Sequence, residues 1–203
     1  MPYLVPPLIP QGRLASSAQP LLPVAGDLLL RPWQPTDAPA VVAAFTDPAI
    51  QRWHVRRADS VDEARGWIAQ WQGAWSAESA AHWAVVRPGT GADAAGDNVL
   101  GRVSLRSMNL GMGLAECAYW VLPAARGTGV AARAVDAVSR WAFETIGFER
   151  LELAHSVANE ASCRVAHRCG FVLEGTRRRG HLHTDGWHDM HVHARVRADD
   201  AEG

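Results

Sequence analysis

The residues best suited to chemistry form a glycine-containing loop between a strand-like and a helix-like segment. The stretch from Tyr119 to Ala132 reads YWVLPAARGTGVAA, with Arg126, Gly127 and Gly129 where the expected helix begins. The first amides of a helix lack partners within the helix and lie at the positive end of its dipole. Glycines let a ligand approach them closely. The loop is therefore predicted to hold a phosphate or pyrophosphate.

Two common phosphate motifs do not account for this loop. A nucleoside-triphosphate loop needs Gly, four residues and then Gly-Lys followed by Ser or Thr, and no such run occurs in the sequence. The three-glycine dinucleotide fingerprint is also absent. The phosphate must belong to another class of ligand.

The elements that position this loop follow from apolar periodicity and from turn residues. Ser60 and Glu63 stand at capping-box spacing ahead of one helix, and Asp185 and Gly186 mark a final hairpin. The expected helices are 38–45, 64–75, 128–146 and 160–168. The expected strands are 28–30, 82–86, 99–105, 115–121, 151–157, 172–183 and 187–196.

Six of the 12 prolines lie in the first 23 residues, which predicts an extended, Pro-rich arm over 1–25 and one domain over 26–198. The net charge of -1 gives no general attraction to nucleic acid or to anionic membranes. Three cysteines form an odd set, and no apolar run approaches membrane-spanning length. We therefore expect a cytoplasmic protein with no nucleic-acid or membrane partner.

Four segments in order resemble the GNAT acetyltransferase superfamily, in its RimJ/RimL-like branch. They are the loop, in which Arg126, Gly129 and Ala131 match the coenzyme A pattern, and the stretches LLLRPW (28–33), AECAYWVLP (115–123) and NEASCRVAHRCGF (159–171). The resemblance implies an α+β GNAT fold: a mostly antiparallel, twisted mixed sheet with a splayed parallel central pair and helices on both faces. It also implies acetyl transfer from acetyl-CoA to an amine by direct attack in a ternary complex.

The same resemblance implies how the cofactor is held. Backbone groups at Trp120 and Val121 would face the splay and pair with pantetheine. Asn159 would bond the cofactor or simply cap the next helix. The loop residues expected to hold the pyrophosphate are Arg126, Gly127, Thr128, Gly129, Val130 and Ala131.

Glu116 is the candidate general base, because an amine must lose a proton before or during attack. It lies five residues before Val121, in a largely apolar strand where a carboxyl group holds a proton more readily than in water. Ser162 resembles the serine that this branch places near the thioester sulfur, where it would assist the departing thiolate. Other branches use a tyrosine at the position of Ala166, so that version is excluded.

The acceptor stays open between a protein N-terminal amine and a small-molecule amine, with Trp53 and His54 as expected contacts. A homodimer is possible. A non-catalytic acyl-CoA-binding regulatory domain is the alternative function. We expect no metal site, because the clustered histidines of the final hairpin lack a cysteine or carboxylate at a recognised ligand spacing. These histidines are His181, His183, His188, His191 and His193.

Overall fold

The computed structural model describes residues 4–89 and 98–198. Its α-helices are α1 (Ala38–Thr46), α2 (Pro48–Gln51), α3 (Val61–Ser76), α4 (Val130–Arg140) and α5 (Glu160–Arg168). Short 3-10 helices cover η1 (Pro35–Asp37) and η2 (Pro123–Ala125), and a π-helical segment, η3 (Trp141–Ile146), extends α4. The strands are β1 (Leu22–Val24), β2 (Leu28–Pro32), β3 (Ala81–Arg87), β4 (Asn98–Asn109), β5 (Leu114–Val121), β6 (Arg150–Ser156), β7 (Val172–His183) and β8 (Gly186–Val196).

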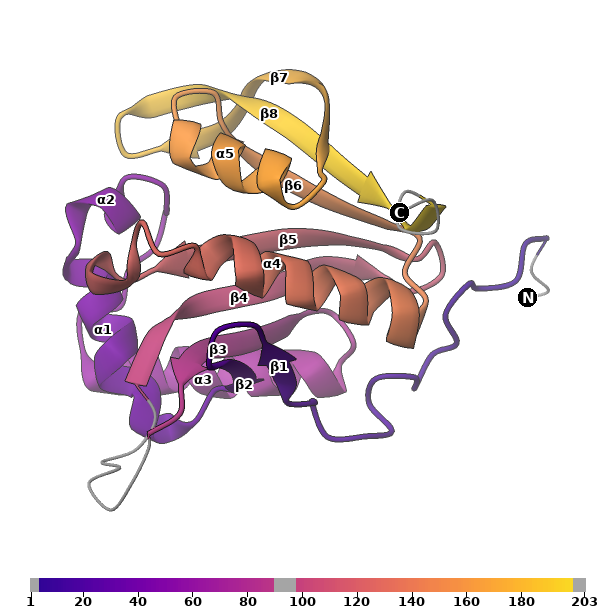
Figure 1. Cartoon of the computed structure of the whole chain (residues 1–203), viewed down its shortest axis with the longest axis horizontal. Helices are drawn as coiled ribbons and strands as arrows, with labels where there is room; N and C mark the ends of the chain where they lie inside the picture. Colours follow the sequence, from indigo (N-terminus) through magenta and orange to yellow (C-terminus); the bar gives the residue numbers. More distant parts are fainter. Residues whose placement is uncertain (1–3, 90–97, 199–203) are drawn as a thin grey trace.

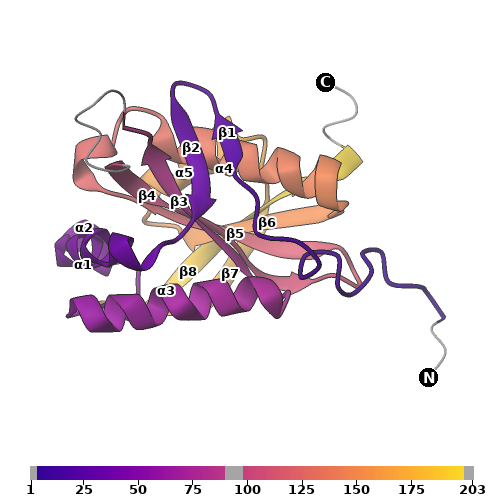
Figure 2. The same ribbon diagram turned by 90° about the horizontal axis from the view of Figure 1, so that it is seen from below.

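These strands form one twisted sheet in the order β1-β2-β3-β4-β5-β6-β8-β7. Neighbours are antiparallel except β5 and β6, which are parallel because α4 carries the chain across between them. Figure 2 shows α3 on one side of the sheet and α4 on the other, and Figure 1 shows α5 against β6 and β8. The expected architecture, a mostly antiparallel mixed sheet with one parallel central pair and helices on both faces, is confirmed.

Apolar side chains fill both faces of this sheet. One cluster packs α4, Phe148 and Phe171 against the strands, and the other packs α1 and α3 around Trp33 and Trp120. Trp71 and Trp75 of α3 are buried, so both side chains belong to the core.

Local signals account for most helix ends. The Ser60 hydroxyl accepts from the Glu63 amide at 3.2 Å and begins α3. The helix expected to run continuously to Ile146 changes to π-helical geometry after Arg140, and it ends at Gly147 with φ +93°. Asp37 precedes α1 but does not cap it through its side chain, because its carboxylate forms a buried bidentate pair with Arg31.

Part of the predicted N-terminal arm belongs to the folded unit. Leu22–Val24 forms the edge strand β1, paired with β2. Upstream, Ile9 and Leu14 are each 1% exposed, and the Glu78 carboxylate accepts from the amide of Leu14 at 2.7 Å. The arm is therefore not extended throughout; its first three residues lie outside the described part of the chain.

Candidate active site

The central parallel pair opens into a wedge. In the described chain, β5 and β6 are paired through Leu114–Arg150, Ala115–Leu151 and Glu116–Glu152, and beyond this point each continues with its other neighbour alone. A cavity of about 1030 Å³ lies here, lined by both strands, the loop before α4, α5 and the end of α2. The expected splay is confirmed.

The register of β5 decides which of its backbone groups face this wedge. The Leu122 amide donates to the Leu100 carbonyl at 2.8 Å, and hydrogen-bonded pairs alternate along an antiparallel ladder. Trp120 therefore directs its backbone at Arg102 of β4, whereas Val121 directs its own backbone at the wedge. The expectation for Trp120 is wrong. The alternation assigns the role to Tyr119 and to Cys117 as well.

The loop before α4 presents an open cradle of amides. Gly127 and Gly129 have φ of +75° and +78°, and an added Cβ at either would meet nothing within 4 Å. α4 begins at Val130 without a side-chain cap. The Thr128 hydroxyl donates to the Ala125 carbonyl at 2.8 Å and closes the turn. The donors at the start of α4 are therefore available to an anion, as the sequence predicts for Val130 and Ala131.

Arg126 is engaged within the protein. It forms an ion pair with Asp47, which precedes α2, and its Nε donates to the Val121 carbonyl at 3.3 Å. This contact ties the loop to the α2 region. Two arginines that sequence reasoning missed, Arg164 and Arg168, line the same cavity from α5. They are four residues apart on one helix face, a spacing that could have drawn attention to them.

Glu116 occupies the narrow end of the wedge, as part of the last residue pair between β5 and β6. From there to Val121 the strand extends roughly 16 Å at about 3.3 Å per residue. Arg106 donates to its carboxylate at 2.5 Å, and the Glu116 side chain is 27% exposed. Its surroundings are thus not the apolar ones that the sequence suggests, because β4 supplies a cation directly opposite.

Asn159 and Ser162 lie together at the start of α5 and line the cavity. The side-chain oxygen of Asn159, Oδ1, accepts from the backbone amide of Ser162 at 3.1 Å, so this side chain does cap the helix. The hydroxyl of Tyr119 donates to Ser162 Oγ at 3.1 Å. Burial raises the pKa of Tyr119 to about 12, against the opposing effect of this hydrogen bond, so the phenol stays protonated. Sequence reasoning missed this tyrosine.

Aromatic and basic side chains form a further part of the cavity wall. Trp53 and His54 follow α2 and line the cavity. The Trp53 ring meets the His183 ring edge-on, with 5.6 Å between the ring centres. Burial lowers the pKa of His54, while a bond from its Nδ1 to the Ile50 carbonyl acts in the opposite direction. The β4 arginines Arg102 and Arg106 complete this wall.

The family model described as an acetyltransferase (GNAT) domain matches residues 27–172, well over half of the chain. The chain belongs to the GNAT acetyltransferase family. Its match runs from just before β2 to the start of β7, and so includes β5, β6, the loop before α4 and α5, whereas the cavity-lining residues of β7 and β8 lie beyond it.

Individual relatives of this GNAT domain agree. The uncharacterised N-acetyltransferase YoaA of Bacillus subtilis (strain 168) is 23% identical over 171 residues, which cover 84% of this chain and 93% of the relative. The ribosomal-protein-serine acetyltransferase of Escherichia coli (strain K12) is 27% identical over 100 residues, 49% of this chain and 56% of that protein. These matches confirm the family and support its RimJ/RimL-like branch.

A solved structure shows the same fold. RimL, a ribosomal L7/L12 alpha-N-protein acetyltransferase in complex with coenzyme A, superposes with a TM-score of 0.77 at 20% identity, over 87% of this chain and 98% of that one. Within residues 4–89 and 98–198 of this GNAT protein, no helix is both long and apolar enough to cross a bilayer.

Proposed function

We propose that this protein transfers the acetyl group of acetyl-CoA to a primary amine by direct attack in a ternary complex. The observation that carries the proposal is the wedge beyond Glu116, which leads along β5 to the open amides at the start of α4. Membership of the GNAT family and relatives named as N-acetyltransferases support it.

The residues present fit coenzyme A. The amides of Gly127 to Ala131 would hold the pyrophosphate, since the space beside both glycines, where a Cβ would stand, is open. The wedge-facing backbone of β5 would pair with the pantetheine amides, as a strand edge pairs with an extended ligand. Asn159 uses its side-chain oxygen as the helix cap, which leaves its NH₂ group to donate a hydrogen bond to the pantetheine part of coenzyme A.

Glu116 would take the proton of the attacking amine, because protonated amines are not nucleophiles and α-amino groups titrate near pH 7.7–8.0. Bound acetyl-CoA supplies an activated thioester carbonyl. Ser162 would donate its hydroxyl proton towards the departing thiolate while Tyr119 donates to Ser162 Oγ. The Tyr119–Ser162 pair would thus supply the acid that other branches supply with a tyrosine at the position of Ala166.

The acceptor would be a protein N-terminal amine or a small-molecule amine that enters beside Trp53 and His54. The wall around this entrance is basic, and Glu116 already pairs with Arg106. This imbalance favours an acceptor that carries an anionic group near its amine. Cytoplasmic location and a homodimer stay predictions.

The decisive experiment compares Glu116→Gln with Glu152→Gln, its register partner on β6, which pairs with Arg150. Free thiol release from acetyl-CoA is measured over a panel of amines, and coenzyme A binding by calorimetry. We expect Glu116→Gln to lower kcat/KM at least about 100-fold, the usual contribution of a general base, with the dissociation constant of coenzyme A little changed. Glu152→Gln should stay near wild type.

Two outcomes would contradict the proposal. Equal activity of Glu116→Gln and wild type would remove Glu116 from the reaction. Tight binding of acetyl-CoA by the wild type without turnover of any amine would favour the alternative, a regulatory acyl-CoA-binding domain.

A further inference from the structure

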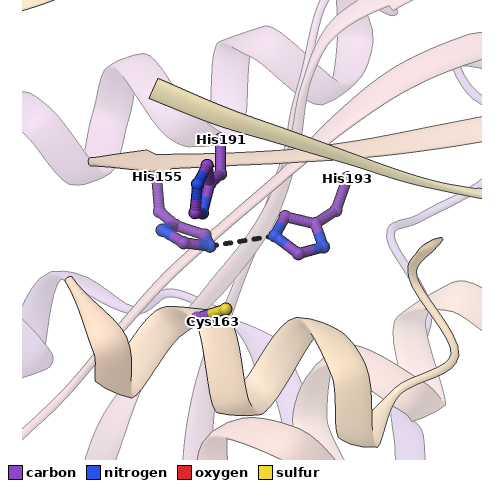
Figure 3. A group of neighbouring side chains, drawn as sticks. All are labelled: His155, Cys163, His191 and His193. Carbon is purple, nitrogen blue, oxygen red and sulfur yellow. Dashed lines mark hydrogen bonds between the residues drawn. The ribbon is translucent and has the colours of Figure 1, made fainter. Parts of the chain in front are cut away.

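A cluster of possible metal ligands lies between the β6–β8 pair and α5. The register of these strands places His155 directly opposite His191, and His193 lies two residues further along β8 on the same face. Cys163 of α5 points at this face (Figure 3). One ligand atom from each of the four side chains lies within 4.8 Å of all the others.

Hydrogen bonds to the backbone determine which ring nitrogens carry protons in the two buried histidines. His155 Nδ1 lies 2.8 Å from the Ser156 carbonyl oxygen, and His193 Nδ1 lies 3.4 Å from the Phe171 carbonyl oxygen. A carbonyl oxygen can only accept, so both Nδ1 atoms must be donors. In the neutral rings, both Nε2 atoms then present a lone pair.

These two Nε2 atoms face each other at 3.1 Å (Figure 3). Two lone pairs at this distance repel unless a cation lies between them. A proton shared between the two rings would place a positive charge on side chains that are only 5% and 0% exposed, which is costly. A divalent metal ion accepts both lone pairs, and the nearby Cys163 thiolate would offset part of its charge.

The distances suit a tetrahedral ion. Zinc binds imidazole nitrogen at about 2.0–2.1 Å, which puts two such ligands about 3.3 Å apart in a tetrahedron. The observed 3.1 Å between the Nε2 atoms is close to that value. In addition, Nδ1 of His191 is buried and has no hydrogen-bond partner among the described residues.

We propose that His155, Cys163, His191 and His193 bind one Zn²⁺ ion in a tetrahedral site. The carbonyls of Ser156 and Phe171 orient two of the rings, as outer-shell partners of zinc histidines commonly do. Binding displaces the Cys163 thiol proton to solvent and forms the Zn–S bond.

The site ties α5 to the β6–β8 side of the wedge. Cys163 directly follows Ser162 in α5, so an ion held there fixes the start of the helix that carries Asn159 and Ser162. The ion is structural and takes no part in acetyl transfer. The proposal departs from the sequence expectation of no metal site, because it adds His155 of β6 and Cys163 of α5 to the hairpin histidines.

The test begins with chelator-treated, full-length protein titrated with Zn²⁺ by calorimetry and with Co²⁺ by absorption spectroscopy. We expect one equivalent of either ion, a Zn²⁺-dependent rise in the melting temperature, and a cobalt spectrum with tetrahedral d–d bands and a thiolate-to-cobalt charge-transfer band. The cobalt spectrum reports thiolate ligation in the wild-type protein, so this part of the test does not depend on a variant that folds. Absence of stoichiometric binding, or a cobalt spectrum without the thiolate band, would overturn the proposal.

Matched variants locate the ion. Cys163→Ser should lose the charge-transfer band and weaken Zn²⁺ binding at least about 10-fold, whereas Cys169→Ser should keep both. His191→Asn should weaken binding similarly, and His181→Asn, in the group formed by His181, His183 and His188, should not. Loss of binding in His181→Asn with retention in Cys163→Ser would place the ion in the hairpin and refute the site.

Discussion

Arg102 is a half-buried cation in the wall of the acceptor cavity, and no carboxylate of the described residues pairs with it. Its Nε is buried without a hydrogen-bond partner, and its guanidinium lies 4.9 Å from the centre of the Trp71 ring. Burial, followed by the charge of Arg106, lowers the pKa of Arg102 to about 10, so it stays charged at neutral pH. An unpaired charge that is partly withdrawn from water is unfavourable, and an anionic ligand would offset that cost.

Arg102 should therefore recognise an anionic group on the acceptor. We expect Arg102→Gln to raise KM at least about 10-fold for an amine bearing a carboxylate, since a charge-assisted hydrogen bond contributes about 1.5–3 kcal/mol. KM for the matching carboxamide should hardly change. Arg102→Lys should restore part of the difference. Steady-state kinetics on paired acceptors check this, and an equal effect on both members would show that Arg102 only shapes the pocket.

At the scale of elements, the loop and the first turn of α4 can be tested separately from fold stability. In Gly129→Ala the added Cβ meets no protein atom within 4 Å, but the residue must hold a side chain at φ +78°, at a cost of about 1–2 kcal/mol. The new methyl group would also stand in the open cradle. We expect coenzyme A affinity to fall at least about 10-fold, because the pyrophosphate needs close approach to these amides.

Gly147→Ala is the matched control, because Gly147 has φ +93° at the far end of the same helical segment. Its unfolding free energy should fall by a similar amount while coenzyme A affinity stays at the wild-type value. Calorimetric binding and chemical denaturation of both variants measure the two effects. Equal losses of affinity would mean that strain, rather than the cradle, weakens binding.

Local patterns predict the elements well but not their contacts. The loop and the Ser60 cap depend on neighbours in sequence, so residue types and spacing reveal them. The Arg106–Glu116 pair depends on strand register instead, and the Tyr119–Ser162 bond requires the β5–β6 wedge to be placed first. The same reason hid the approach of Cys163 to the hairpin histidines, since a helix and two strands must first be packed together.

At the scale of the whole molecule, buried neutral histidines couple folding to pH. Burial, followed by the charges of Arg102 and Arg106, lowers the pKa of His82 to about 3. Its ordinary value is 6.5, so between these values the unfolded chain binds a proton that the folded chain does not. The stabilising effect is complete above pH 6.5 and is lost as the pH falls towards 3. His54, His155, His183 and His193 are lowered in the same direction.

The free energy of unfolding should consequently decrease below pH 6.5, with His82 alone contributing up to about 1.4 kcal/mol per pH unit. Chemical denaturation at several pH values between about 7.5 and 4.5 measures this slope. His82→Gln should reduce the slope of the unfolding free energy against pH by up to about 1.4 kcal/mol per pH unit, because glutamine does not titrate. His181→Gln, at an exposed ring, is the matched control. If the slope of His82→Gln equals that of the wild type, His82 takes up its proton in the folded protein, and the acid sensitivity arises elsewhere.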